Sequence, residues 1–304
     1  MNRFDNVIIS ILHKLFYFRR TTIKMHKIFR ERQFEKLCVF SHFDSSNTIH
    51  PYVVYYIKCL YELDFDIVFV STSKELSEKE IGKLDKYIFS CLHRTNVGYD
   101  FGSWKVGLFS VAYKEYKEIL FANDSVYGPL FDLRAVFAEM DSLKSDIWGI
   151  TDSWSIQFHL MSYFIVYREN VIQSKIFDDL WKSIVFLPRF FKSFIIKKYE
   201  IGFSQIYLKH GYNLQAYCNY YELLDKVIES NEVECYTQRI KREKLTSTIY
   251  FWKPLITYMK SPFLKVEVLK KNVSEVDNYD VYHILKQYSR YDCELIMEHL
   301  KKLV

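Results

Sequence analysis

The strongest structural signal in the chain is the segment Ile119-Leu-Phe-Ala-Asn123-Asp124-Ser125-Val-Tyr-Gly128-Pro129. Here an apolar run stops at a small polar cluster, which is followed by a Gly-Pro turn. This pattern is typical of a buried parallel strand that carries a carboxylate at its C-terminal end. Open α/β sheets bind ligands at that edge, so the polar cluster lies where a binding site is expected.

A second block lies upstream and reads Arg94-Thr-Asn96-Val-Gly98-Tyr-Asp100-Phe-Gly-Ser-Trp-Lys105. Its glycines allow the backbone to approach another group closely, and a basic and an acidic residue stand beside them. Together the two blocks predict a pocket for a nucleotide-activated sugar. The residues expected to bind this donor are His42, Asp44, Ser71, Arg94, Asn96, Gly98, Asp100, Lys105, Asn123, Asp124 and Ser125.

Apolar runs and amphipathic segments alternate along the chain. Strands are expected near 36–41, 66–73, 87–92, 118–122 and 146–152, with an antiparallel strand at 159–167. Helices are expected at 50–63, 77–87, 103–117 and 131–143. This alternation predicts an α/β fold with a Rossmann-type, mostly parallel sheet flanked by helices.

The chain of 304 residues is 49% apolar and has no low-complexity tract, so it can bury a large core. We expect three parts: a basic amphipathic segment at 1–35, a catalytic domain at 36–221, and a helical extension at 222–304 packed on it. Six cysteines without metal-binding spacing and no apolar run of about 18 residues favour a cytoplasmic protein without a spanning helix.

The positive charge is concentrated at the N-terminus. Residues 1–36 hold nine Lys or Arg and three acidic residues, whereas the whole chain has a net charge of +5. A basic amphipathic segment of this kind either lies on an anionic membrane surface or forms a helix packed on the body. Nucleic acid is not expected as a partner, because the basic excess does not continue into the body.

The cluster Asn123-Asp124-Ser125 resembles the acidic cluster with which GT-A sugar-nucleotide transferases hold a divalent cation. On this interpretation Asp124 positions Mg²⁺ or Mn²⁺ against the diphosphate of the donor. The structural alternative is an N-cap on the following helix.

The segment from Tyr199-Glu200 to Gly211-Tyr212 resembles the part of inverting GT-A enzymes that carries the general base. An inverting transfer needs a carboxylate that takes the proton of the acceptor hydroxyl. Glu200 is the first candidate and Asp152, which also ends a strand, is its rival. Stabilisation of a helix N-terminus is the alternative role of Glu200.

Three more of these assignments have structural alternatives. Arg94 and Asp100 would form an ion pair that shapes the glycine turn, His42 and Asp44 would lie in a surface turn, and His159 would be a satisfied core residue. His159 and Ser162 are the expected contacts of the acceptor.

Several motifs in the same order resemble the rhamnan synthesis protein F family over residues 37–300. They are Ser41-His42-Phe-Asp44, the strand from Asp66, Arg94-x-Asn96-x-Gly98-Tyr-Asp100, Asn123-Asp-Ser-x-Tyr-Gly-Pro129, Asp146-x-Trp148-Gly-x-Thr151, His159-x-x-Ser162-Tyr-Phe164, Tyr199-Glu200, Pro262-Phe-Leu-Lys265-Val-Glu267 and Tyr291-Asp292. The resemblance implies a GT-A-like glycosyltransferase of bacterial rhamnan, O-antigen or capsule synthesis.

It further implies a nucleotide-sugar donor, often dTDP-rhamnose, and a lipid-linked or oligosaccharide acceptor at the inner face of the cytoplasmic membrane. The alternative is a non-catalytic glycan-binding or assembly subunit of the same pathway, which the single carboxylate of the Asn-Asp-Ser cluster favours.

Overall fold

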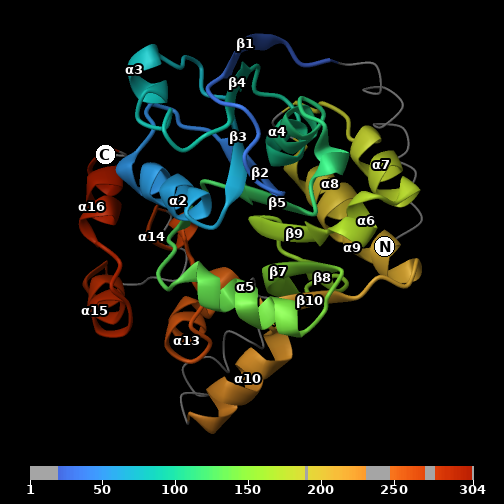
Figure 1. The fold of residues 1–304 in the computed structure, drawn as a ribbon. Helices are drawn as coiled ribbons and strands as arrows, with labels where there is room; N and C mark the ends of the chain where they lie inside the picture. Colours follow the sequence, from blue (N-terminus) through green and yellow to red (C-terminus); the bar gives the residue numbers. More distant parts are fainter. Residues whose placement is uncertain (1–19, 189–190, 231–246, 271–277, 303–304) are drawn as a thin grey trace.

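A central sheet organises the computed structural model, which describes residues 20–188, 191–230, 247–270 and 278–302. The strand order is β1-β4-β3-β2-β5-β9-β7-β10, and β8 pairs with β7 (Figure 1). Strands β4, β3, β2 and β5 are parallel, while β1 and β9 run antiparallel to their neighbours. The strands are β1 Ile23–Ile28, β2 Lys36–His42, β3 Phe65–Ser71, β4 Ser90–Arg94, β5 Glu118–Asn123, β7 Ile147–Ser153, β8 His159–Leu160, β9 Phe164–Arg168 and β10 Leu214–Cys218.

Helices cover both faces of the sheet, which gives two separate apolar cores. One face is covered by α2 Pro51–Tyr61, α5 Leu133–Ser142, α13 Trp252–Thr257, α15 Asn278–Tyr288 and α16 Glu294–Lys301. The other is covered by α4 Tyr99–Leu108, α7 Lys175–Lys182 and α9 Gly202–Lys209. The remaining helices are α3 Glu78–Ile81, η1 Tyr113–Glu115, α6 Glu169–Ile172, α8 Lys192–Ile195, η2 Ile196–Ile201, α10 Tyr220–Glu229, α12 Ser247–Tyr250 and α14 Val266–Lys270.

Strand β2 lies in the middle of this arrangement and is buried on both sides. Leu37 and Val39 belong to one core, and Cys38 and Phe40 to the other. Both faces are therefore apolar, as parallel strands between two helical layers require. Helix α4 packs so closely that a Cβ at Gly107 would lie 2.4 Å from Val39 Cγ1. This close approach holds the C-terminal half of α4 tightly against the sheet.

The predicted fold class is confirmed: a mostly parallel sheet is flanked by helices, as in GT-A-like proteins. The helical N-terminal extension is not found in the described residues, because 23–28 form the edge strand β1 paired with β4. Residues 1–19 lie outside the described part of the chain. The helix expected at 103–117 begins earlier, at Tyr99, after Gly98 with φ +80°.

The region after residue 222 is not purely helical. Strand β11 Leu264–Lys265 pairs antiparallel with β6 Val126–Tyr127, which directly follows the Asn-Asp-Ser cluster. This two-stranded sheet brings the C-terminal region to the strand ends where the site was expected. The division of the chain at residue 222 stays a prediction.

Candidate functional site

The site begins at Asp100, in the first turn of α4. Its carboxylate accepts hydrogen bonds from Ser41 Oγ at 2.8 Å and from Asn123 Nδ2 at 3.2 Å. Ser41 and Asn123 are register partners at the ends of the parallel strands β2 and β5, so both side chains reach the same oxygen pair. Burial raises the pKa of Asp100, whereas the Ser41 hydrogen bond and the charge of Lys265 act in the opposite direction.

Lys265 brings a cation to the same place from β11. Its Nζ donates to Ser125 Oγ at 2.9 Å and lies 4.4 Å from the ring centroid of Tyr163. Burial lowers the pKa of Lys265 to about 8, although the carboxylates of Glu200 and Asp100 oppose this shift. The sequence reasoning did not assign Lys265 to the site, although it stands in the Pro262–Glu267 motif that supported the family resemblance.

Glu200 lies opposite these groups on η2, a π-helical turn. Such turns often occur at functional sites, because the extra residue redirects a side chain. Glu200 Oε1 accepts a hydrogen bond of 2.8 Å from the backbone N–H of Ser162. Asp100, Asn123, Ser125, Ser162, Glu200 and Lys265 all line one cavity of about 300 Å³. We call it the strand-end pocket.

Arg94 is fully buried and its guanidinium is used by the protein itself. It donates to the carbonyl oxygens of Thr95, Val97 and Tyr99 at 2.7–3.0 Å and to Ser103 Oγ at 2.8 Å. The arginine thus shapes the glycine turn, which is the structural role weighed above, and it does not line the strand-end pocket. The expected ion pair between Arg94 and Asp100 is replaced by hydrogen bonds from Arg94 to backbone carbonyl groups.

Other predicted donor residues also lie outside the pocket lining. Lys105 Nζ donates to the carbonyl oxygens of Lys182 and Ile184, both at 2.7 Å. The N–H of Gly98 donates to Leu187 O at 2.7 Å, and Asn96 is only partly buried in the same turn. Their proposed contacts with a donor stay predictions.

Asp124 points away from its two neighbours in the polar cluster. Asn123 and Ser125 line the pocket, whereas Asp124 Oδ2 accepts from the N–H of Phe43 at 2.8 Å and lies 3.9 Å from His42 Nε2. Burial raises the pKa of Asp124 to about 8, and the charges of Asp100 and Asp44 add to the shift. Its role as a metal ligand stays a prediction.

Three more predicted donor residues, His42, Asp44 and Ser71, lie on the side of the strand ends to which Asp124 points. His42 Nδ1 lies 3.0 Å from Ser71 Oγ, and burial lowers the pKa of His42 to about 4. Asp44 lies beside His50 and His299, and these three side chains are spaced closely enough to hold a metal ion.

Asp152 and His159 lie away from the strand-end pocket as well. Asp152 Oδ1 accepts from the N–H of Tyr220 at 2.7 Å at the start of α10, and Oδ2 from Trp154 Nε1 at 3.2 Å. His159 Nδ1 contacts Gln157 O at 2.9 Å in a buried position. The geometry favours the structural alternative for His159, while Ser162 remains next to Glu200.

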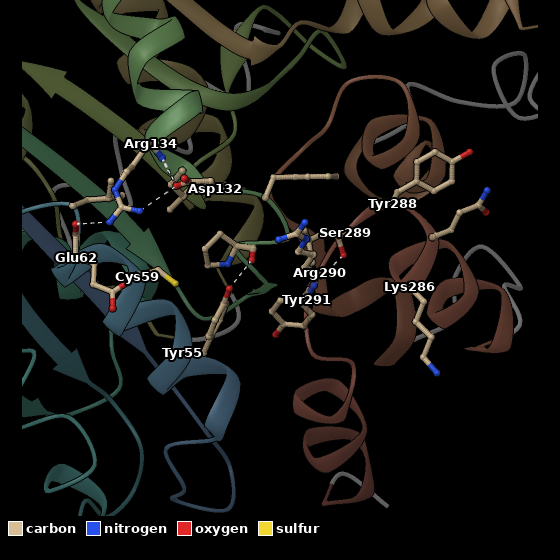
Figure 2. Close-up of a pocket in the computed structure, with 16 residues that line it drawn as sticks. Tyr55, Cys59, Glu62, Asp132, Arg134, Lys286, Tyr288, Ser289, Arg290 and Tyr291 are labelled. Atoms are coloured by element: carbon tan, nitrogen blue, oxygen red, sulfur yellow. Dashed lines mark hydrogen bonds and ion pairs between the residues drawn. The ribbon is translucent and has the colours of Figure 1, made fainter.

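A larger cavity of about 720 Å³ lies elsewhere, between α2, the start of α5 and the C-terminal segment (Figure 2). Figure 2 shows Tyr55 of α2 facing Tyr291, and their ring centroids are 5.5 Å apart. Arg134 donates to the carbonyl oxygen of Glu62 and forms an ion pair with Asp132. Helix α2 begins at the C-terminal end of β2 and runs toward the N-terminal ends of the parallel strands. Its last residues, which line this cavity, therefore lie away from the C-terminal strand ends. The strand-end pocket is therefore the better candidate for the reaction site.

Comparisons with known proteins agree with the predicted resemblance. The family model described as rhamnan synthesis protein F matches residues 67–304. Virulence protein VirA of Vibrio anguillarum is 27% identical over 199 residues, which are 60% of this chain and 62% of VirA. Uncharacterized protein y4gN of Sinorhizobium fredii is 27% identical over 156 residues, 49% of this chain and 40% of that protein. The matches thus span less than two thirds of either relative.

Among solved structures, the glycosyltransferase GlyE of Streptococcus pneumoniae is 10% identical, with a TM-score of 0.45, over 89% of this chain and 64% of GlyE. A nucleotide-diphospho-sugar transferase from Desulfovibrio desulfuricans is 11% identical, with a TM-score of 0.37, over 60% of this chain and 80% of that one.

We predict that Asp124→Asn stabilises the protein at pH 8 and has little effect near pH 4. The pKa of Asp124 is about 8 in the folded protein and near 4 in the unfolded chain. Between pH 4 and pH 8, Asp124 is therefore protonated in the folded protein and ionised in the unfolded chain. The stability associated with Asp124 is therefore present at low pH and is lost as pH rises toward 8. Asparagine removes this loss and can still accept from the N–H of Phe43.

Thermal unfolding between pH 4.5 and 8.5 measures the difference, with the exposed Asp85→Asn as the matched control. A variant that is less stable than the parent at pH 8 would contradict the prediction and favour an ionised Asp124.

Proposed function

Because the chain belongs to the rhamnan synthesis protein F family, we propose that it transfers a sugar from a nucleotide-sugar donor to a growing bacterial surface polysaccharide. The observation that carries this proposal is the strand-end pocket, where Asp100, Glu200 and Lys265 meet at the edge that binds ligands in open α/β sheets. Rhamnose is the default sugar, and O-antigen, capsule or cell-wall rhamnan is the product. The acceptor is a lipid-linked glycan or an oligosaccharide.

Glu200 is the proposed general base of an inverting transfer. The Ser162 N–H donates to Oε1, and within the described part of the chain no hydrogen bond goes to Oε2, which is therefore the oxygen proposed to contact the acceptor hydroxyl. Removal of the hydroxyl proton in the transition state makes the oxygen a better nucleophile toward the anomeric carbon. Asp100 is less suited to this role, because Ser41 and Asn123 already donate to both of its oxygens.

Lys265 is the proposed charge partner of the leaving diphosphate. Its Nζ is buried beside Ser125, so an anion entering the pocket would meet a desolvated ammonium group. A divalent cation at Asp124 is the alternative. It would require the Asp124 carboxylate to leave the N–H of Phe43 and turn toward the pocket.

We predict that Glu200→Gln lowers the rate of transfer by about 10²–10⁴, the usual contribution of a general base. Glutamine keeps the shape and the bond from Ser162, so donor affinity should stay near that of the parent. Rates come from release of nucleoside diphosphate, and affinities from calorimetry with the intact donor. Asp152→Asn is the matched control. If that variant loses turnover while Glu200→Gln keeps it, the base is Asp152.

We predict that Lys265→Met weakens binding of dTDP or UDP at least tenfold and lowers the rate by about 10², as loss of a preorganised charge partner does. Lys209→Met, which removes an exposed ammonium group at the end of α9, should change neither value. Activity of the parent should survive EDTA. Complete loss with EDTA, restored by Mg²⁺ or Mn²⁺, would return the charge-neutralising role to a metal ion.

The competing function is a non-catalytic glycan-binding or assembly subunit. Incubation with a panel of nucleotide sugars and a glycan acceptor distinguishes the two, since release of nucleoside diphosphate requires turnover. A subunit of this kind would bind glycan without any release.

Membrane association is proposed for the basic segment 1–35. None of the helices in the described part of the chain has the length and apolar character needed to span a bilayer. Each basic residue near an anionic surface contributes about 1 kcal/mol, and salt screens the effect. We predict that deletion of residues 1–19, which leaves the edge strand β1 in place, lowers sedimentation with anionic vesicles at low salt. Equal sedimentation of the full and shortened chains would refute this.

A further inference from the structure

Three buried side chains from distant parts of the chain meet beside the end of β2. Asp44 follows β2, His50 is the N-cap of α2, and His299 lies on α16. Their exposed fractions are 8%, 2% and 4%. One carboxylate oxygen and one ring nitrogen from each histidine lie within 4.8 Å of one another. Figure 1 shows α16 alongside α2, so the cluster joins the two ends of the described chain.

Other groups already orient two of the three side chains, Asp44 and His299. Ser46 donates to Asp44 Oδ1 from both N–H and Oγ, at 2.9 and 2.6 Å, and the N–H of Thr48 donates to it at 3.0 Å. Oδ2 is thereby left facing His50 Nε2 at 3.3 Å.

His299 is oriented in the same manner. Its Nδ1 lies 2.8 Å from the hydroxyl of Tyr127, which leaves Nε2 as the ring nitrogen for the cluster. Partners on the far side of metal-binding imidazoles and carboxylates fix their orientation and raise affinity. Two of the three candidate ligands, Asp44 and His299, therefore have the outer contacts of a metal site, while the Nδ1 of His50 has no hydrogen-bond partner in the described part of the chain.

We propose that Asp44, His50 and His299 bind a zinc ion that fastens α16 to the loop after β2. Two imidazole nitrogens and one carboxylate oxygen are a donor set that suits Zn²⁺, whereas Mg²⁺ prefers oxygen ligands throughout. At zinc–ligand distances of about 2.0–2.2 Å, neighbouring ligands of a tetrahedral ion are roughly 3.3 Å apart. The Asp44–His50 separation already has this value, and since all three ligand atoms lie within 4.8 Å of one another, His299 has to move closer by at most about 1.5 Å.

The fourth position would be taken by water. The site differs from the strand-end pocket, whose lining includes none of the three residues. A failure to bind zinc would therefore leave the proposed glycosyl transfer standing, and a lack of transfer activity would leave the zinc proposal standing.

The full chain, loaded with zinc sulfate and desalted, should retain one zinc per molecule by elemental analysis. His299→Ala, His50→Ala and Asp44→Asn should each lose it, whereas His210→Ala, an exposed histidine at the end of α9, should keep it. Tyr127→Phe removes the hydroxyl behind His299 and should weaken zinc affinity by roughly 10–100-fold in a chelator competition.

Cobalt substitution provides a readout that does not require variants to fold. A tetrahedral Co²⁺ site gives intense visible absorption bands, and zinc should displace them. Zinc contents far below one per chain in the parent protein would overturn the proposal. Retention of zinc by folded His50→Ala and His299→Ala would also overturn it, and would assign the metal to other groups such as cysteines.

Discussion

A buried ammonium group needs partners, and this need at Lys265 links the parts of the strand-end pocket to one another. Its charge is placed among Ser125, the ring of Tyr163, and the carboxylates of Asp100 and Glu200. These groups come from the end of β5, the turn before β9, the start of α4 and the π-helical turn. The lysine reaches them because β11 pairs with β6. Without that short pairing, the partly buried carboxylates of Asp100 and Glu200 would line the same pocket without the charge of Lys265, and like charges in one site disfavour each other.

Arg94 has a similar organising role, but for the backbone. In the turn from β4 into α4, the guanidinium of Arg94 donates to three backbone carbonyl groups, those of Thr95, Val97 and Tyr99, and so fixes the path of the backbone there. The turn that results starts α4 at Tyr99, and this places Asp100 in the first helical turn against the ends of β2 and β5. A charged residue beside glycines in a sequence can thus hold the backbone that forms a site, rather than contact the ligand itself.

Much of the fold could be read from the sequence. The apolar runs at 36–41, 66–73 and 118–122 became buried parallel strands, because such strands show their burial on both faces as uninterrupted apolar residues. The N-terminal edge strand could not be predicted in this way: Ile23–Ile28 is largely exposed, so its pattern mixes apolar and basic residues and resembles an amphipathic helix. Lys265 could not be predicted as a site residue either, since its position depends on the pairing of Leu264–Lys265 with Val126–Tyr127, two short segments far apart in the sequence. The family motif around it was the available signal.

The bend at the end of β5 carries the last consequence. Asp124 and Ser125 form a bend after β5, in which the N–H and Oγ of Ser125 donate to Asn123 Oδ1. Asn123 and Ser125 therefore line the pocket together, while Asp124 faces His42 and the N–H of Phe43. The two sides of one strand end therefore serve two polar clusters with different chemistry. The C-terminal region completes both, with Lys265 on one side and His299 on the other. We infer that residues 222–304 are part of the functional unit, because neither cluster has its full set of charged groups and ring nitrogens without them.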